Sequence, residues 1–123
     1  MISRMRFASI TVTDMCAAKD FYVSKLGFRL LVETPLPGGN QFVMVAPAGG
    51  GSSLVFSMPM PGREHIAVSS IAFETDDVRL THDELVAKGV AFPKPPADTP
   101  WGGVEAVFAD PFGNNFMLQQ GGM

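Results

Sequence analysis

Few residues of this 123-residue chain have the types and spacing that catalysis requires. The two histidines, His65 and His82, stand apart in a turn-rich segment and a helix-like segment, and neither has neighbours at metal-ligand spacing. The single cysteine, Cys16, has no histidine partner and is expected to be buried or inert. The strand carboxylates placed for acid–base chemistry are Glu74 and Glu105, and both are expected to face solvent. These residues favour a binding protein over an enzyme.

The composition narrows the class of partner. A formal net charge of −3 with no basic run gives no footprint for nucleic acid or for an anionic membrane. Charged residues make up 17% of the chain and apolar residues 46%, so apolar side chains must be hidden in a core, an oligomer interface or a pocket. One cysteine allows no internal disulfide, and no apolar stretch approaches the roughly 20 residues of a membrane span. We expect a cytoplasmic protein with small-molecule or protein partners.

The first half of the chain begins with a strand–helix unit. Residues 6–13 alternate in a β-pattern, and Asp14 then supplies a helix N-cap. A helix is predicted over 15–26, with Gly27 as its stop.

The second half repeats this order. A strand is predicted over 69–75, Asp76 or Asp77 caps a helix over 78–88, and Gly89 ends that helix. The repeat predicts two copies of one structural module.

Three further strands follow the helix in each half, and "DPFGN" predicts the turn of the last hairpin. Each half therefore reads β-α-β-β-β, which predicts an α+β domain whose helices pack on one side of curved sheets. The further strands are expected at 28–34, 40–47 and 52–58, and at 90–94, 103–110 and 114–120.

Four segments, in order, carry a family resemblance: "ITVTDMCAAKDFYVSKLGF", "IAFETDDVRLTHDELVAKGVAF", "PWGG" and "FADPFGNNFML". Together they resemble the vicinal oxygen chelate (VOC) superfamily, which includes glyoxalase I, extradiol dioxygenases and bleomycin-resistance proteins. The resemblance implies one domain over residues 1–123, made of βαβββ modules at 1–60 and 61–123. It further implies partly open β-barrels with the helices outside, and assembly into a homodimer.

Enzymes of this superfamily hold a divalent metal through histidine, acid or glutamine side chains on the first and last strands of the modules. The resemblance places these ligands at Phe7, Val55, Ser70 and Met117, and none of the four is a histidine, an acid or a glutamine. Phenylalanine and valine have no donor atom, and a thioether is a weak ligand for a hard divalent ion. We therefore expect no metal and no cofactor.

The faces that carry these positions would line a ligand cavity. Its mixture of aromatic, thioether, hydroxyl and amide groups suits a small, partly aromatic organic molecule. Packing of Phe7 against Met117 as ordinary core is an equally open reading. The expected ligand-binding residues are Phe7, Ser9, Ser70, Trp101, Asn115, Met117 and Gln119.

Three functions follow from these observations. The leading hypothesis is a metal-independent protein that binds an antibiotic or metabolite. The alternative is a metal-dependent, glyoxalase-like lyase, isomerase or dioxygenase with atypical ligands. In the third, the sheet surface associates with proteins and the chain has no small-molecule ligand.

Overall fold

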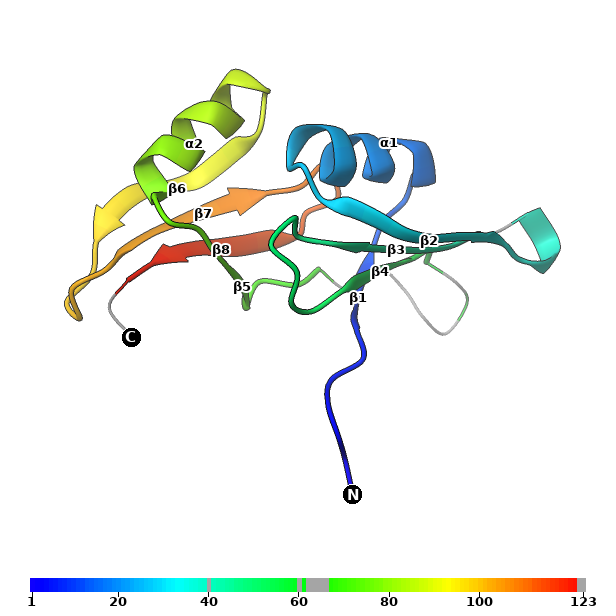
Figure 1. Cartoon of the computed structure of the whole chain (residues 1–123). Helices are drawn as coiled ribbons and strands as arrows, with labels where there is room; N and C mark the ends of the chain where they lie inside the picture. The colour runs from blue at the N-terminus through cyan, green and yellow to red at the C-terminus, as the bar shows by residue number, and fades with distance from the viewer. Residues whose placement is uncertain (40, 60, 62–66, 122–123) are drawn as a thin grey trace. The chain divides into compact units, whose positions relative to one another are not determined.

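Each half of the chain forms its own compact unit. The structure is a computed structural model, which describes residues 1–39, 41–59, 61 and 67–121. The two units are Met1–Ile66 and Ala67–Met123. In each unit, helical turns cover one face of a curved four-stranded sheet (Figure 1). The predicted α+β fold of paired βαβββ modules is confirmed, with curved sheets and no closed barrel.

The sheet of the first unit has the strand order β1-β4-β3-β2. β1 runs parallel to β4, and the other neighbouring strands are antiparallel. Its elements are β1 (Ala8–Thr11), α1 (Met15–Lys19), the π-helix η1 (Asp20–Lys25), β2 (Arg29–Pro35), the short turn η2 (Pro37–Gly39), β3 (Gln41–Ala46) and β4 (Leu54–Ser57).

The second unit repeats this topology with the order β5-β8-β7-β6, in which β5 runs parallel to β8. Its other strand pairs are antiparallel. Its elements are β5 (Ile71–Glu74), α2 (Val78–Ala87), β6 (Ala91–Asp98), β7 (Val104–Ala109) and β8 (Asn115–Gln120).

Both helices begin at the predicted aspartates. Asp14 accepts a hydrogen bond from the backbone N–H of Ala17, and Asp77 accepts one from Leu80, each at 3.0 Å. Asp77, and not Asp76, is therefore the cap of α2. Each helical segment is followed by a glycine with positive φ, 75° at Gly27 and 88° at Gly89. Residues that have a Cβ atom disfavour this backbone conformation.

The predicted helix over 15–26 is present as a continuous helical segment, but its second part is a π-helix. After α1 the chain continues as a π-helix, in which the N–H of Leu26 reaches the carbonyl of Phe21, five residues back. We attribute the wider turn to packing, because Phe21 and its neighbour Tyr22 are both buried.

Strand β6 is longer than the predicted 90–94, because it continues to Asp98 through Pro93, Pro95 and Pro96. Proline has no backbone N–H to donate, so these residues argue against a strand in the sequence. β6 is the edge strand of its sheet, and its pairing with β7 is irregular, which accommodates the prolines.

Aromatic side chains fill the core between helix and sheet in each unit. In the first unit Tyr22, fully buried, packs against Phe56 with ring centroids 5.2 Å apart. In the second unit Phe108 and Phe116 are 5.4 Å apart, and Phe73 joins them. Burial of one such ring contributes about 1.5–3 kcal/mol, so each unit depends on its own aromatic cluster.

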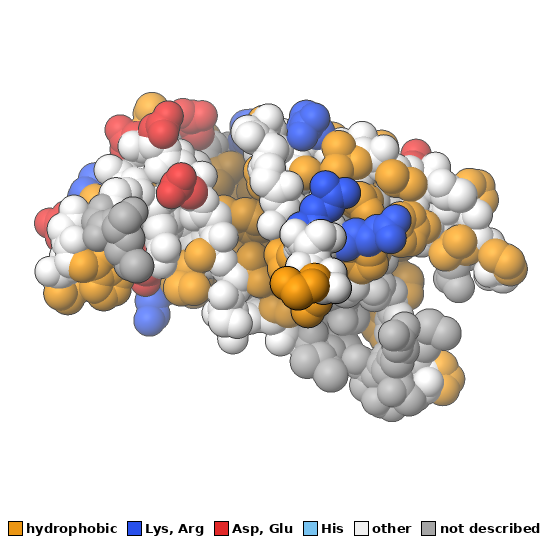
Figure 2. All heavy atoms as spheres, turned by 60° about the horizontal axis from the view of Figure 1, so that its bottom comes forward, with side chains coloured by type: hydrophobic (Ala, Val, Ile, Leu, Met, Phe, Trp, Pro, Cys, Tyr) orange, Lys and Arg blue, Asp and Glu red, His pale blue; other side chains and the backbone are white. Residues whose placement is uncertain are grey.

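Apolar side chains also remain exposed on both units, among them Leu30, Leu36, Leu80 and Trp101. Figure 2 shows exposed apolar side chains interspersed with polar and charged ones over the visible face. Across the described residues, no helix is long and apolar enough to span a membrane.

Candidate functional site

The sheet of the second unit has a polar face opposite its helix. Along β8, Phe116 and Leu118 are buried, whereas Asn115, Met117 and Gln119 alternate with them and are half-buried. This alternation puts the three half-buried residues on the face away from the core.

Met117 lies at the middle of this polar face. In register it stands between Ala72 on β5 and Val107 on β7. Its sulfur is 4.0 Å from Nε2 of Gln119. Ala72, Met117 and Val107 thus form an apolar strip across this face, beside the polar residues in register with Gln119.

Gln119 and Glu105 form the main polar contact of this face. Nε2 of Gln119 donates a 2.7 Å hydrogen bond to Oε2 of Glu105. Both residues are half-buried, and their strands place them directly opposite each other. On the other side, Glu74 at the end of β5 is exposed and stands in register with Gln119.

Two open hollows lie in the second unit, and Trp101 lines both. The smaller, about 250 Å³, is lined by Trp101, Glu74, Gln119 and Gln120 among others. The larger, about 420 Å³, includes Trp101 and Glu105, and its further lining is largely apolar and proline-rich. The larger volume lies within the range of small-molecule pockets in proteins.

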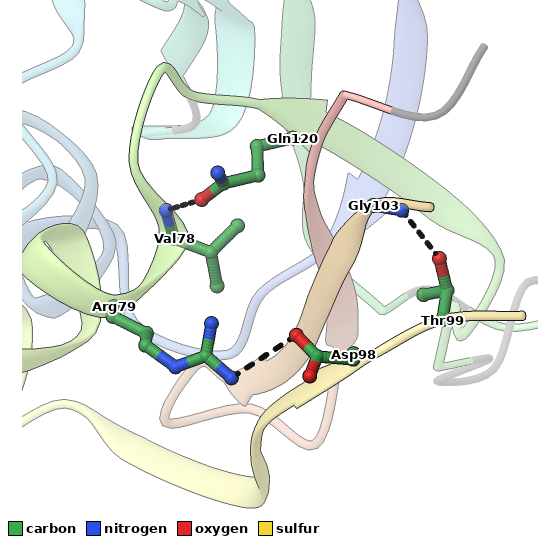
Figure 3. A network of polar contacts seen from close by, with 6 residues as sticks. All are labelled: Val78, Arg79, Asp98, Thr99, Gly103 and Gln120. Carbon is green, nitrogen blue, oxygen red and sulfur yellow. Dashed lines mark hydrogen bonds and ion pairs between the residues drawn. The ribbon is translucent and has the colours of Figure 1, made fainter. Parts of the chain in front are cut away.

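The turn that carries Trp101 is held by its own hydrogen bonds. The hydroxyl of Thr99 accepts from the N–H of Gly103 at 2.9 Å, as Figure 3 shows. The backbone N–H of Thr99 donates to the carbonyl of Gly103 at 2.9 Å, and the N–H of Gly102 donates to the carbonyl of Thr99 at 3.2 Å. The Trp101 side chain on this turn is 53% exposed. Much of its aromatic surface therefore faces solvent and is not used in core packing.

Two side-chain contacts join the start of α2 to the sheet beside these hollows (Figure 3). Oε1 of Gln120 accepts a hydrogen bond from the backbone N–H of Val78 in the first turn of α2. Arg79 forms an ion pair with Asp98 at the end of β6, 3.4 Å apart. The first contact directs Oε1 of Gln120 toward α2, whereas the alternation along β8 puts the side chain of Gln119 on the open face.

The first unit also has a face away from its helix. There Ser9 on β1 stands in register with Val55 on β4, which in turn pairs with Met44 on β3. Phe7 and Phe42 meet edge to face, with centroids 6.4 Å apart. Phe7, which is half-buried, therefore contacts an aromatic ring of its own unit.

The four positions of the superfamily's metal ligands do not fit a divalent metal. Phe7, Val55, Ser70 and Met117 offer no carboxylate or imidazole. Among residues 1–39, 41–59, 61 and 67–121, no three or more histidine, cysteine or acidic side chains gather at metal-binding distance.

His82 does not belong to the polar face. His82 packs its ring edge against Phe92 at 4.5 Å, and its Nδ1 lies 3.0 Å from Oδ1 of Asp83. This is a structural role on α2. His65 lies outside the described residues.

The structure brings some of the expected ligand-binding residues together. Trp101 and Gln119 line one hollow. Asn115 and Met117 share the face of Gln119. Ser70 directly precedes β5 and is exposed, whereas Phe7 and Ser9 belong to the first unit.

Other expectations need correction. Glu105 lies on the face away from the core, as expected of a solvent-facing side chain, but it is half-buried there and accepts a hydrogen bond from Gln119. Its orientation could have been found from Ala106 and Phe108, whose alternation along β7 puts Glu105 on the opposite face. Thr99 could not be identified from the sequence, because the hydrogen bond by which its hydroxyl holds the turn of Trp101 exists only in the folded chain. Cys16 is exposed, not buried.

The fold of the chain agrees with comparisons to known proteins. The chain matches the Glyoxalase/Bleomycin resistance protein/Dioxygenase superfamily over residues 4–118. An uncharacterized protein of Bacillus subtilis strain 168, YetH, is 31% identical over 122 residues, which is 98% of this chain and 100% of the relative. This chain therefore belongs to the Glyoxalase/Bleomycin resistance protein/Dioxygenase superfamily.

Two solved structures are similar over nearly the whole chain. A member of the same superfamily from Sphaerobacter thermophilus DSM 20745 has a TM-score of 0.87 and 32% identity, covering 98% of each chain. TnmS3, an antibiotic binding protein from Streptomyces sp. CB03234, has a TM-score of 0.85 and 39% identity, covering 97% of this chain and 96% of its own.

Proposed function

We propose that this chain binds a small, partly aromatic organic molecule, an antibiotic or a metabolite, without a metal. The observation that carries the proposal is the placement of Trp101. Its half-exposed side chain lines both hollows of the second unit, beside the polar face that bears Gln119. Aromatic rings combine a large apolar area with few rotatable bonds, which suits them to hold flat ligands.

The similarity to TnmS3 supports the same function, since 39% identity over nearly the full chain is compatible with a shared type of ligand. The binding residues in this proposal are those expected from the sequence. They are Phe7 and Ser9 in the first unit, and Ser70, Trp101, Asn115, Met117 and Gln119 in the second.

Metal independence is supported by the side chains at the superfamily's ligand positions. A site with Phe7, Val55, Ser70 and Met117 lacks the donors that hard divalent ions require. The proposal includes one domain over residues 1–123, a homodimer and a cytoplasmic location, and it includes no nucleic-acid or membrane partner. Light scattering at micromolar concentration tests the dimer, which a monomeric mass would contradict.

A thermal-shift screen of aromatic natural products and metabolites tests the function. We expect at least one compound to raise the melting temperature, because a ligand that binds only the folded state stabilises it. The effect should be lost in Trp101→Ala and kept in Leu80→Ala, which removes another exposed apolar side chain away from the hollows. A screen without hits, or hits that are unaffected by Trp101→Ala, would contradict the proposal.

A further inference from the structure

The hydrogen bond between Gln119 and Glu105 fixes the direction of the Gln119 amide. A carboxylate only accepts hydrogen bonds, so the NH₂ group of Gln119 must face Glu105, as the 2.7 Å contact from Nε2 has it. The NH₂ group is thereby engaged. The carbonyl oxygen of Gln119 is left to accept hydrogen bonds from elsewhere.

Three side chains that can accept hydrogen bonds form a row across the sheet. Glu74, Gln119 and Glu105 stand in register on β5, β8 and β7, in that order. We call these three residues the acceptor row, because its outward polar atoms are two carboxylates and one amide oxygen.

Basic side chains do not neutralise the acceptor row. In the described part of the chain, the ion pairs are Lys19–Glu33, Arg79–Asp98 and His82–Asp83, so none includes Glu74 or Glu105. Lys94 lines the larger hollow together with Glu105 but forms no ion pair with it. Among the described residues, the acceptor row therefore has no basic side chain paired with it, and the hydrogen bond that Glu105 accepts comes from Gln119 within the row.

Trp101 gives this row an aromatic neighbour. It shares the smaller hollow with Glu74 and Gln119, and the larger one with Glu105. The Thr99–Gly103 turn holds its backbone in place, so little conformational entropy is lost when a ligand stacks on its ring.

We infer that the ligand of this site is a flat aromatic cation that carries N–H groups. Its rings stack on Trp101, and its N–H groups donate to the acceptor row. A cation is favoured over a neutral donor by charge-assisted hydrogen bonds and by its attraction to the indole face. This inference rests on the proposed function and adds the chemical class of the ligand.

Two probes with the same three-ring system test the inference. 9-Aminoacridine is a flat aromatic cation at neutral pH, and acridine-9-carboxylate is its anionic counterpart. Binding of each is measured by isothermal titration calorimetry at pH 7 and physiological ionic strength, which screens the net charge of the protein. We expect the amine to bind at least about tenfold more tightly than the carboxylate.

Variants assign this preference to the acceptor row. Glu105→Gln should reduce the preference several-fold, and Glu74→Gln provides a second test at an exposed position in case the first variant folds poorly. Glu84→Gln is the matched control, because it removes one negative charge from the exposed surface of α2. Equal binding of both probes, or an equal loss in Glu84→Gln, would overturn the inference and leave the proposed function standing. Binding of neither probe would overturn the inference, whereas the compound screen decides the proposed function.

Discussion

Asp110 and Asn114 hold the last hairpin together through three hydrogen bonds. The backbone N–H and the side-chain NH₂ of Asn114 donate to the two carboxylate oxygens of Asp110, at 2.9 and 2.7 Å. The backbone N–H of Asp110 donates in turn to the carbonyl of Asn114 at 2.9 Å. Asn114 is fully buried, and its Oδ1 accepts from the N–H of Val68, which fixes the chain leading into β5.

Asn114→Ala should therefore destabilise the protein. The substitution removes the donor to one carboxylate oxygen of Asp110 and the acceptor for the N–H of Val68, and loss of a partner by a buried polar group costs about 1–3 kcal/mol. Urea unfolding measures the change. Asn115→Ala is the control, because this neighbouring amide is half-buried and makes no side-chain hydrogen bond to the described residues. An equal loss of stability in both variants would contradict the role of Asn114.

The helix caps give a second prediction. Asp14→Ala and Asp77→Ala should each lower the free energy of unfolding by about 1 kcal/mol, because each removes the acceptor for one N–H in the first turn of a helix. Asp76→Ala removes a carboxylate of the same charge that caps nothing and should have little effect. Thermal or urea unfolding measures the loss of stability in the three variants. Equal losses in Asp76→Ala and Asp77→Ala would exclude Asp77 as the cap.

Gly103 is required by the turn that carries Trp101. A Cβ at this position would lie 2.5 Å from the carbonyl oxygen of Gln120, so Gly103→Ala must displace the backbone. We expect lower stability and a shifted emission maximum of Trp101 in fluorescence spectra. Gly49→Ala, where a Cβ meets open space, should change neither. An unchanged spectrum of Gly103→Ala would show that the turn does not hold Trp101 in place.

Lys19 and Glu33 give a prediction for alkaline pH. The hydrogen bond to Glu33 raises the pKa of Lys19 above its ordinary value of 10.5. A raised pKa in the folded state means that the stabilisation is fully present below about pH 10.5 and is lost as the pH rises through the folded pKa.

The titration of Lys19 by NMR measures this shift. Glu33→Gln should lower the pKa of Lys19, and Glu84→Gln should leave it unchanged. Because the Lys19 side chain is 27% exposed, salt should weaken the shift. A pKa unaffected by Glu33→Gln would contradict this ion pair.

The fold was predictable because local rules agree with it. The alternation of Ile10 and Val12 with Ser9 and Thr11 has the burial pattern expected of β1. Two features of the fold were not predicted, because they depend on packing beyond the local sequence. They are the π-helix around Phe21 and the proline-containing edge strand β6.

The candidate site was predictable only in part. Trp101 stood out by type, and Gln119 by its alternation with Leu118. The hydrogen bonds of Glu105 to Gln119 and of Thr99 within the turn of Trp101 become visible only when strand register and turn geometry are known.

The measurement that tests the central claim most directly is a Trp101 fluorescence titration with a screened ligand, performed on chelator-treated protein. Trp101 is the single tryptophan, so its emission reports on the site without interference from other tryptophans. We predict saturable quenching with the same dissociation constant before and after chelation. Binding that disappears with the chelator and returns with a divalent metal would contradict metal-independent recognition at this site.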